Sequence, residues 1–171
     1  MNIEMTTGGL AIPIDAYPHI QEDQTLQEAI AVIRSLSCEE QLQFSELLVL
    51  NDREQLSGRV TVRELLEGLE PRLLKRKRKW KFEGLEDDYP NLTILWEESF
   101  FKKCHGRAGK PIKEFLSPIK RTVKVTDPLL KTLYIMMRKQ ENNLPVLMKK
   151  RVVGVVRIKE VFAAICSYCD F

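Results

Sequence analysis

A run of basic residues that contains one aromatic side chain is the most distinctive chemical feature of this 171-residue chain. The run lies within Leu73–Lys81 and consists of Lys75, Arg76, Lys77, Arg78, Lys79, Trp80 and Lys81. Cationic side chains bind phosphate and an indole ring stacks on bases, so the run suits contact with a nucleic acid. It equally suits an anionic membrane or protein surface, or the solvated face of a helix neutralised by the acidic patch at residues 83–88.

This run also decides the sign of the charge on the whole protein. The formal net charge is +3, and without Arg72 and the six cations of the run it would be −4. A nucleic-acid function would therefore depend on residues 72–81 and would weaken steeply with salt. Nucleic-acid binding through this run is kept as an alternative function.

Cysteine and histidine residues give little support to catalysis or metal binding. Cys166 and Cys169 have the spacing of half a zinc site or of a redox pair, and Cys104 with His105 could add two ligands. A second pair with that spacing is missing, and cysteine is often only a small buried residue. His19, the other histidine, has no nucleophile motif near it. We expect no catalytic residues, no metal site and no obligatory cofactor.

The elements that would position any site come from a unit that occurs twice. Residues 58–64 read GRVTVRE and residues 154–160 read GVVRIKE. Apolar runs on both sides of a short polar turn precede each phrase, which predicts a hairpin of largely buried strands. An apolar helical stripe follows each phrase, formed by Leu65, Leu66 and Leu69 in the first unit and by Val161, Phe162 and Ile165 in the second.

A further helix is predicted upstream of each hairpin. Leu26, Ile30 and Ile33 form one apolar stripe, and Leu129, Leu133 and Met136 form the other. Each unit is therefore strand, helix, strand, strand, helix, and the fold class is α/β. We expect residues 1–11 to be a loose terminus and residues 12–69 to be the first unit. Residues 70–109 should be a basic insert with an amphipathic helix, and residues 110–171 the second unit.

The composition is typical of a globular protein without membrane segments. Hydrophobic residues make up 44% of the chain and charged residues 30%. No apolar run approaches the roughly 18–20 residues that a membrane helix requires. No Lys or Arg precedes Arg34, so the basic start of a secretory leader is missing. We expect a cytoplasmic protein whose cysteines are free thiols.

The chain contains twice the order helix, strand, turn, strand and helix, and in the second copy the two strands carry the sequences LPV and VVGVV. This order resembles a tandem pair of cystathionine β-synthase (CBS) domains, the regulatory Bateman module. The resemblance covers roughly residues 12–69 and 110–168, and is weaker in the first repeat, where Leu48 replaces the strand proline. It implies two βαββα repeats packed through their sheets, with an inserted helical linker that the minimal module lacks. It also implies a protein that is regulatory and not an enzyme.

The resemblance further implies an adenosine-nucleotide site in the grooves between the repeats. In that family, backbone near the LPV strand contacts the base, a hydroxyl residue approaches phosphate, and an acid at the start of the last helix holds the ribose hydroxyls. The corresponding positions are Gly58, Thr61 and Glu64 in the first repeat, and Val123, Leu144, Pro145, Val146, Gly154, Arg157 and Glu160 in the second.

Three of these positions depart from the family pattern. Glu64 and Glu160 stand where Asp is usual, and Arg157 stands where a hydroxyl residue is usual. The longer glutamates would need the backbone to sit further from a ribose, whereas Arg157 could pair with a phosphate. The alternative is that both glutamates only favour the helix dipole and that Arg157 is a solvated edge residue.

We therefore predict a regulatory or sensory module in which a nucleotide such as AMP, ADP or ATP shifts the packing of the repeats and changes a partner contact or a dimer. The resemblance implies a homodimer through the helices. Met136, Met137, Phe162 and Tyr168 are candidates for that face, unless they belong to the core. The alternatives are the nucleic-acid-binding protein and a purely structural interaction protein with empty grooves.

Overall fold

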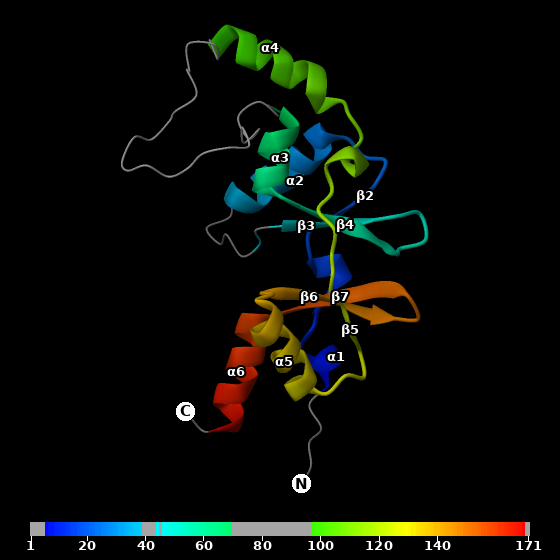
Figure 1. The fold of residues 1–171 in the computed structure, drawn as a ribbon, viewed down its shortest axis with the longest axis vertical. Coiled ribbons are helices and arrows are strands. Elements are labelled where there is room, and N and C mark those ends of the chain that lie inside the picture. The colour runs from blue at the N-terminus through cyan, green and yellow to red at the C-terminus, as the bar shows by residue number, and fades with distance from the viewer. Residues whose placement is uncertain (1–5, 39–43, 45, 70–96, 170–171) are drawn as a thin grey trace, which may run out of the picture.

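The computed structural model describes residues 6–38, 44, 46–69 and 97–169. These residues form two units of mixed helix and sheet, whose sheets face each other across the middle of the molecule (Figure 1). The α/β class and the two repeats packed through their sheets are therefore confirmed. The basic run at 72–81 and the apolar residues at 92–96 lie outside the described residues.

The first unit has the strand order β2-β3-β4, with β2 parallel to β3 and β3 antiparallel to β4. Its elements are β2 (His19–Gln21), α2 (Leu26–Cys38), β3 (Glu46–Leu50), β4 (Leu56–Thr61) and α3 (Val62–Leu69). All five residues of β3 are buried, which explains the continuous apolar run in this part of the sequence.

The second unit repeats this arrangement. Its elements are β5 (Val123–Lys124), α5 (Leu129–Lys139), β6 (Asn143–Met148), β7 (Arg151–Arg157) and α6 (Ile158–Tyr168). β5 is parallel to β6, which is antiparallel to β7. A two-residue turn joins β6 to β7, and both of its residues, Lys149 and Lys150, have positive φ, at 49° and 73°.

The leading segment of each repeat lies on the other unit. β1 (Ile12–Pro13), which is followed by the 3-10 turn η1 (Ile14–Ala16), pairs antiparallel with β7 and completes the sheet β1-β7-β6-β5. In return, η3 (Ile112–Phe115) packs on the first unit, and Ser117 forms an antiparallel bridge with Arg59 of β4. Each unit therefore contains a piece of the other repeat.

The glycine of the repeated phrase permits this crossing. A Cβ at Gly154 would clash with the backbone carbonyl of Ile12, and a Cβ at Gly58 would lie 3.0 Å from the carbonyl oxygen of Ser117. Both glycines therefore stand where another stretch of backbone passes too closely for a side chain.

Three apolar cores hold the molecule together. The first unit is centred on Leu26, Leu47 and Val49, and the second on Leu144, Val146 and Val156. The third core lies between the two sheets and contains Tyr17, Leu48, Leu50, Val152 and Val155. Leu48, which replaces the family proline, thus joins the units. Met136 is only 1% exposed and belongs to the second core, so its expected place on a dimer face is wrong.

The N-terminal segment differs from the loose terminus expected from its small, polar composition. Residues 7–10 form α1 (Thr7–Leu10), and Thr7 is fully buried against the second unit. Its hydroxyl donates to the carbonyl of Asp127 over 2.9 Å, and the backbone N–H of Gly8 donates to the carbonyl of Val125 over 3.0 Å. The small residues allow this close packing, because a Cβ at Gly8 would meet the Val125 side chain at 2.5 Å.

The described end of the insert is helical. α4 (Glu97–Ala108) lies against α2 and α3, above the first unit in Figure 1. Among the helices described, none combines the length and the apolar character that crossing a membrane requires.

Candidate functional site

The predicted acid of the first repeat lies at the corner where β4 becomes α3. Glu64 accepts hydrogen bonds at Oε2 from the backbone N–H of Thr61, over 2.8 Å, and from the Thr61 hydroxyl. The Thr61 hydroxyl in turn accepts from the backbone N–H of Arg63, so these bonds cap the start of α3. At Oε1, Glu64 accepts a 2.6 Å hydrogen bond from the hydroxyl of Ser117, which belongs to the other repeat.

These partners keep Glu64 ionised. Burial alone would raise the pKa of Glu64, but the hydrogen bonds from Ser117 and Thr61 outweigh it and hold the pKa below its usual value. The same carboxylate borders a cavity of about 390 Å³, which is lined by Glu64, Glu67, Glu114, Phe115, Leu116 and Ser117. Three carboxylates favour a ligand that presents hydroxyl or amino groups here and keeps its phosphates elsewhere.

In the second repeat, Arg157 and Glu160 form a bidentate ion pair. Nε of Arg157 donates to Oε2 of Glu160 over 2.8 Å, and Nη2 donates to Oε1. The Arg157 side chain is only 10% exposed, and its guanidinium lies 5.3 Å from the ring centre of Phe44, a cation–π contact. The expectation that Arg157 could be a solvated edge residue is therefore wrong.

The pKa values of this pair follow from its geometry. The hydrogen bond to Glu160 raises the pKa of Arg157. Burial acts to raise the pKa of Glu160, but the hydrogen bond and charge of Arg157 lower it below the usual value. A ligand that used Glu160 would have to separate a closed pair, so this corner is less open to a ribose than the corner at Glu64.

A buried polar network ties the two units together beside Arg157. Glu46, at the start of β3, accepts at Oε1 from the Tyr17 hydroxyl over 3.2 Å and from the Asn143 amide over 3.1 Å. Its Oε2 accepts from Arg59 over 3.4 Å, and Arg59 also lies 3.6 Å from Glu141. Burial and the charge of Glu46 raise the pKa of Tyr17. The network joins the starts of β3 and β6 across the interface.

The remaining predicted residues contribute little side-chain surface. Val123, Leu144 and Val146 are at most 2% exposed and lie in the second core, and Pro145 is also buried. Gly58 and Gly154 face the crossing backbone. Base recognition at these positions would therefore use main-chain groups, and it stays a prediction.

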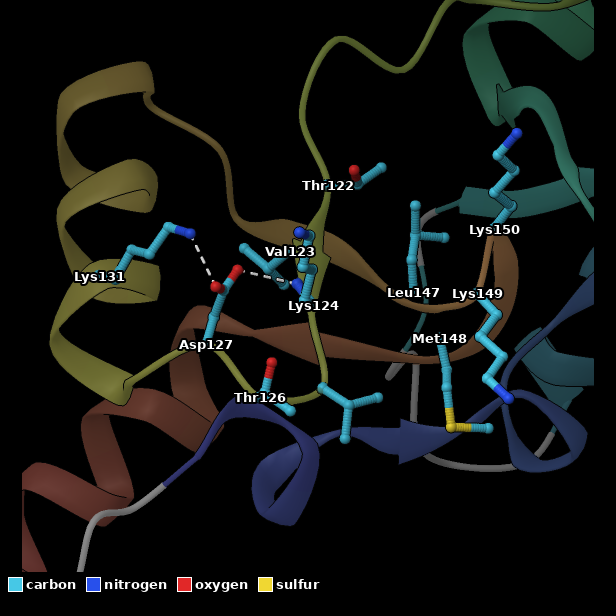
Figure 2. Close-up of a pocket in the computed structure, with 11 residues that line it drawn as sticks. Thr122, Val123, Lys124, Thr126, Asp127, Lys131, Leu147, Met148, Lys149 and Lys150 are labelled. Carbon is cyan, nitrogen blue, oxygen red and sulfur yellow. Dashed lines mark hydrogen bonds and ion pairs between the residues drawn. The ribbon is translucent and has the colours of Figure 1, made fainter.

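Sequence reasoning missed a second cavity, of about 530 Å³, beside β5 and the start of α5 (Figure 2). Its lining has an apolar part, formed by Val123, Val125, Leu147 and Met148, and a polar part, formed by Thr122, Lys124, Thr126, Asp127, Lys131, Lys149 and Lys150. Asp127 accepts from the backbone N–H of Lys124 over 2.9 Å and from Lys131 over 2.7 Å. The signal that could have revealed this cavity is a pair of lysines in a two-residue turn, where Asn and Gly are preferred.

Ser117 and Phe44 were also missed as partners of the predicted acids and of Arg157. The pairing of Ser117 with Glu64 joins residues 53 positions apart, which local sequence patterns do not encode. Within the described part of the chain, Cys104, Cys166 and Cys169 form no disulfide, and no group of three or more His, Cys, Asp or Glu side chains is placed to hold a metal ion.

Comparison with protein families settles the class of these paired units. The family model described as "CBS domain" matches residues 10–71 and 112–167. The chain belongs to the CBS-domain family. Both matched segments contain a full copy of the helix, hairpin and helix described above, so this is a tandem CBS pair.

Solved structures of CBS proteins share this fold. A CBS domain-containing protein of unknown function from Kribbella flavida is 16% identical with a TM-score of 0.69, over 95% of this chain and 99% of the other. CbpB in complex with c-di-AMP is 12% identical with a TM-score of 0.64, over 98% and 89%. The cytosolic domain of the Mg²⁺ channel MgtE in complex with ATP is 17% identical with a TM-score of 0.60, and this chain spans 49% of that one. No curated protein matches the chain.

Proposed function

We propose that this CBS pair is a non-catalytic regulatory module that binds an adenosine-containing nucleotide, such as AMP, ADP or ATP, in a groove between its repeats. Membership of the CBS family supports a regulatory role, and structures of the same fold hold ATP and c-di-AMP. The proposal covers the grooves predicted from Gly58, Thr61 and Glu64 and from Arg157 and Glu160.

One observation favours the groove of the first repeat. Glu64 already accepts a hydrogen bond from a hydroxyl group, that of Ser117, at the edge of a cavity. A ribose hydroxyl can take the place of the Ser117 hydroxyl with the same geometry, and the ring of Phe115 offers an apolar surface beside it. In the second groove, both oxygens of Glu160 are held by Arg157.

This arrangement suggests how binding would be transmitted. Ser117 belongs to the second repeat but lies on β4 of the first, to which it is joined by backbone hydrogen bonds with Arg59. A ligand that displaces the Ser117 side chain from Glu64 weakens one tie between the repeats. It would thereby shift the population toward a different packing of the two units.

Thermal unfolding against AMP, ADP, ATP, S-adenosylmethionine and a dinucleotide tests the proposal. Selective binding to the folded protein raises the melting temperature by mass action. We expect at least one adenosine ligand to do so for the wild type and for Glu160→Ala, but not for Glu64→Ala. Glu28→Ala, which also removes a first-turn acid of a helix, is the matched control and should keep the response.

One result would contradict this proposal, and another would move the ligand to the second groove. If no ligand raises the melting temperature at millimolar concentration, the grooves are empty and the structural alternative stands. If Glu160→Ala abolishes the response and Glu64→Ala does not, the ligand occupies the second groove instead. The nucleic-acid alternative rests on residues 72–81, outside the described residues, and predicts binding to nucleic acid that falls steeply with salt.

A further inference from the structure

The cavity beside β5 carries an excess of positive charge that the fold itself does not balance. Four lysines and one aspartate line it, which leaves a net charge of +3. Asp127 is engaged by the side chain of Lys131 and by the backbone N–H of Lys124. Across the described ranges, neither Lys149 nor Lys150 forms an ion pair, although the adjacent Arg151 pairs with Glu54. Two ammonium groups at this rim therefore have no anionic partner within the described protein.

The backbone at the same place is unfavourable for the residues it carries. Lys149 and Lys150 form the two central positions of the β6–β7 turn, and both have positive φ. Turns of this kind favour Asn and Gly, because a side chain with a Cβ and a long stem is strained in the left-handed region. Two consecutive strained lysines at the rim of one cavity are better explained by binding than by folding.

The lysines come from three different elements around the cavity. Figure 2 shows Asp127 and Lys131 at the start of α5 on one side of β5, and the turn with Lys149 and Lys150 on the other. Thr122 and Thr126 add hydroxyl donors from the chain on either side of β5. The ammonium groups of Lys149 and Lys150 point in opposite directions from the turn in Figure 2, so a ligand that bridges the helix and the turn would draw these long side chains toward the threonine hydroxyls.

We propose that this cavity binds a compact polyanion with two or more phosphate groups. A net charge of +3 is balanced by a diphosphate or triphosphate, whereas a singly charged ion would leave most of it unopposed. The phosphates belong either to a free inorganic polyphosphate or to the tail of a nucleotide. The site uses β5, α5 and the β6–β7 turn, so it is separate from the groove at Glu64 and does not rest on nucleotide binding there.

The decisive variant is Lys149→Asn/Lys150→Gly, made in the full chain. It removes both unpaired cations and installs the sequence that the turn prefers, so loss of folding cannot explain its phenotype. With inorganic tripolyphosphate as the probe, we expect the melting temperature of the wild type to rise. We expect the variant to bind more than about tenfold more weakly. Without a ligand, the variant should melt at a temperature equal to or above that of the wild type.

Further variants and ligands distinguish specific binding from nonspecific electrostatic attraction, and they identify the source of the phosphates. Lys113→Asn/Lys139→Asn removes the same number of charges from exposed positions away from the cavity and should keep the full response. Glu64→Ala should keep it too. With the groove at Glu64 removed, ATP stabilising Glu64→Ala but not Glu64→Ala/Lys149→Asn/Lys150→Gly identifies a nucleotide tail, whereas a response to tripolyphosphate alone identifies a free polyphosphate. The proposal is overturned if tripolyphosphate leaves the wild type unchanged, or if both double variants lose the response equally.

Discussion

At the scale of single residues, Arg157 shows how one side chain can occupy both oxygens of a predicted ligand-binding acid. Its guanidinium holds both oxygens of Glu160 and lies against the ring of Phe44. In the first repeat, the hydroxyl residue at the equivalent position, Thr61, engages only one oxygen of Glu64 and leaves the other to accept from Ser117. Arg157 therefore makes the predicted ligand position at Glu160 a self-satisfied contact between the units.

We predict that Arg157→Ala lowers the free energy of unfolding by about 1–3 kcal/mol, because it leaves a half-buried carboxylate without its partner. Arg151→Ala is the matched control. It breaks an ion pair with Glu54 in which both side chains are more than 60% exposed, and it should cost less than about 1 kcal/mol. Urea unfolding of both variants gives the comparison, and equal losses would show that the Arg157 pair contributes no more than a surface pair.

The acids in these pairs also set the response to pH. Glu64, Glu160 and Asp127 have pKa values lowered in the folded state. Because an unfolded Glu titrates near about 4.3 and Asp near about 3.9, the stability they supply is complete above about pH 5 and is lost as the pH falls through their folded values. Urea unfolding between pH 6 and 3 should show this loss. Glu64→Gln should make the fall in unfolding free energy with decreasing pH less steep. An unchanged pH dependence would contradict a contribution from Glu64.

At the scale of elements, the crossing of the leading segments depends on a backbone-to-backbone approach at each glycine of the repeated phrase. We predict that Gly154→Ala destabilises the protein by about 1–3 kcal/mol, since the carbonyl of Ile12 must move away. Gly106→Ala, inside α4 with no described atom near its would-be Cβ, should instead stabilise by up to about 1 kcal/mol. Thermal unfolding of both variants measures whether each substitution lowers or raises the stability. An unchanged melting temperature for Gly154→Ala would mean that β1 can shift without an energetic cost.

The elements themselves were largely predictable, but their crossing was not. The expected helix over residues 62–69 is α3, and the two hairpins occur where apolar runs flank a turn, because burial on both faces imposes such runs. β1 has only two residues and carries no periodicity, so nothing in the sequence showed that it pairs with β7. For the candidate site, the sequence located Thr61 and Glu64 correctly at a strand-to-helix corner. The sequence did not predict that Ser117 donates to Glu64. Ser117 lies at that corner only because the leading segment of the second repeat crosses onto the first unit.

At the scale of the whole molecule, one helical face of the second unit is left apolar and exposed. Tyr134 and Met137 on α5, and Phe162 and Tyr168 on α6, are each at least 65% exposed, and Leu130 continues the stripe on α5. Three of the four residues expected at a dimer face are among them. We propose that this face joins two copies of the chain, since an apolar surface of this extent is costly in water.

The prediction is a concentration-dependent dimer that Tyr134→Asp/Phe162→Asp converts to a monomer. A buried charge at the centre of an apolar interface is strongly unfavourable. Sedimentation equilibrium measures the result, with Met148→Asp as the control because Met148 is exposed but lies at the end of β6, away from both helices. A wild type that stays monomeric at about 100 μM would contradict the proposal, because specific dimers usually have dissociation constants below that concentration.

The exchange of leading segments also bears on the ancestry of the molecule. The second unit on its own would lack β1, the strand that completes its sheet. The leading segment of each repeat would also be without the other unit on which it packs. Two separate copies could exchange these segments only by associating, which costs translational and rotational entropy. Fusion of two copies in one polypeptide makes the exchange intramolecular and raises the effective concentration of each arm. Because the pairing is built into one chain, the two copies need not be identical, and they differ at equivalent positions, with Thr61 in the first and Arg157 in the second.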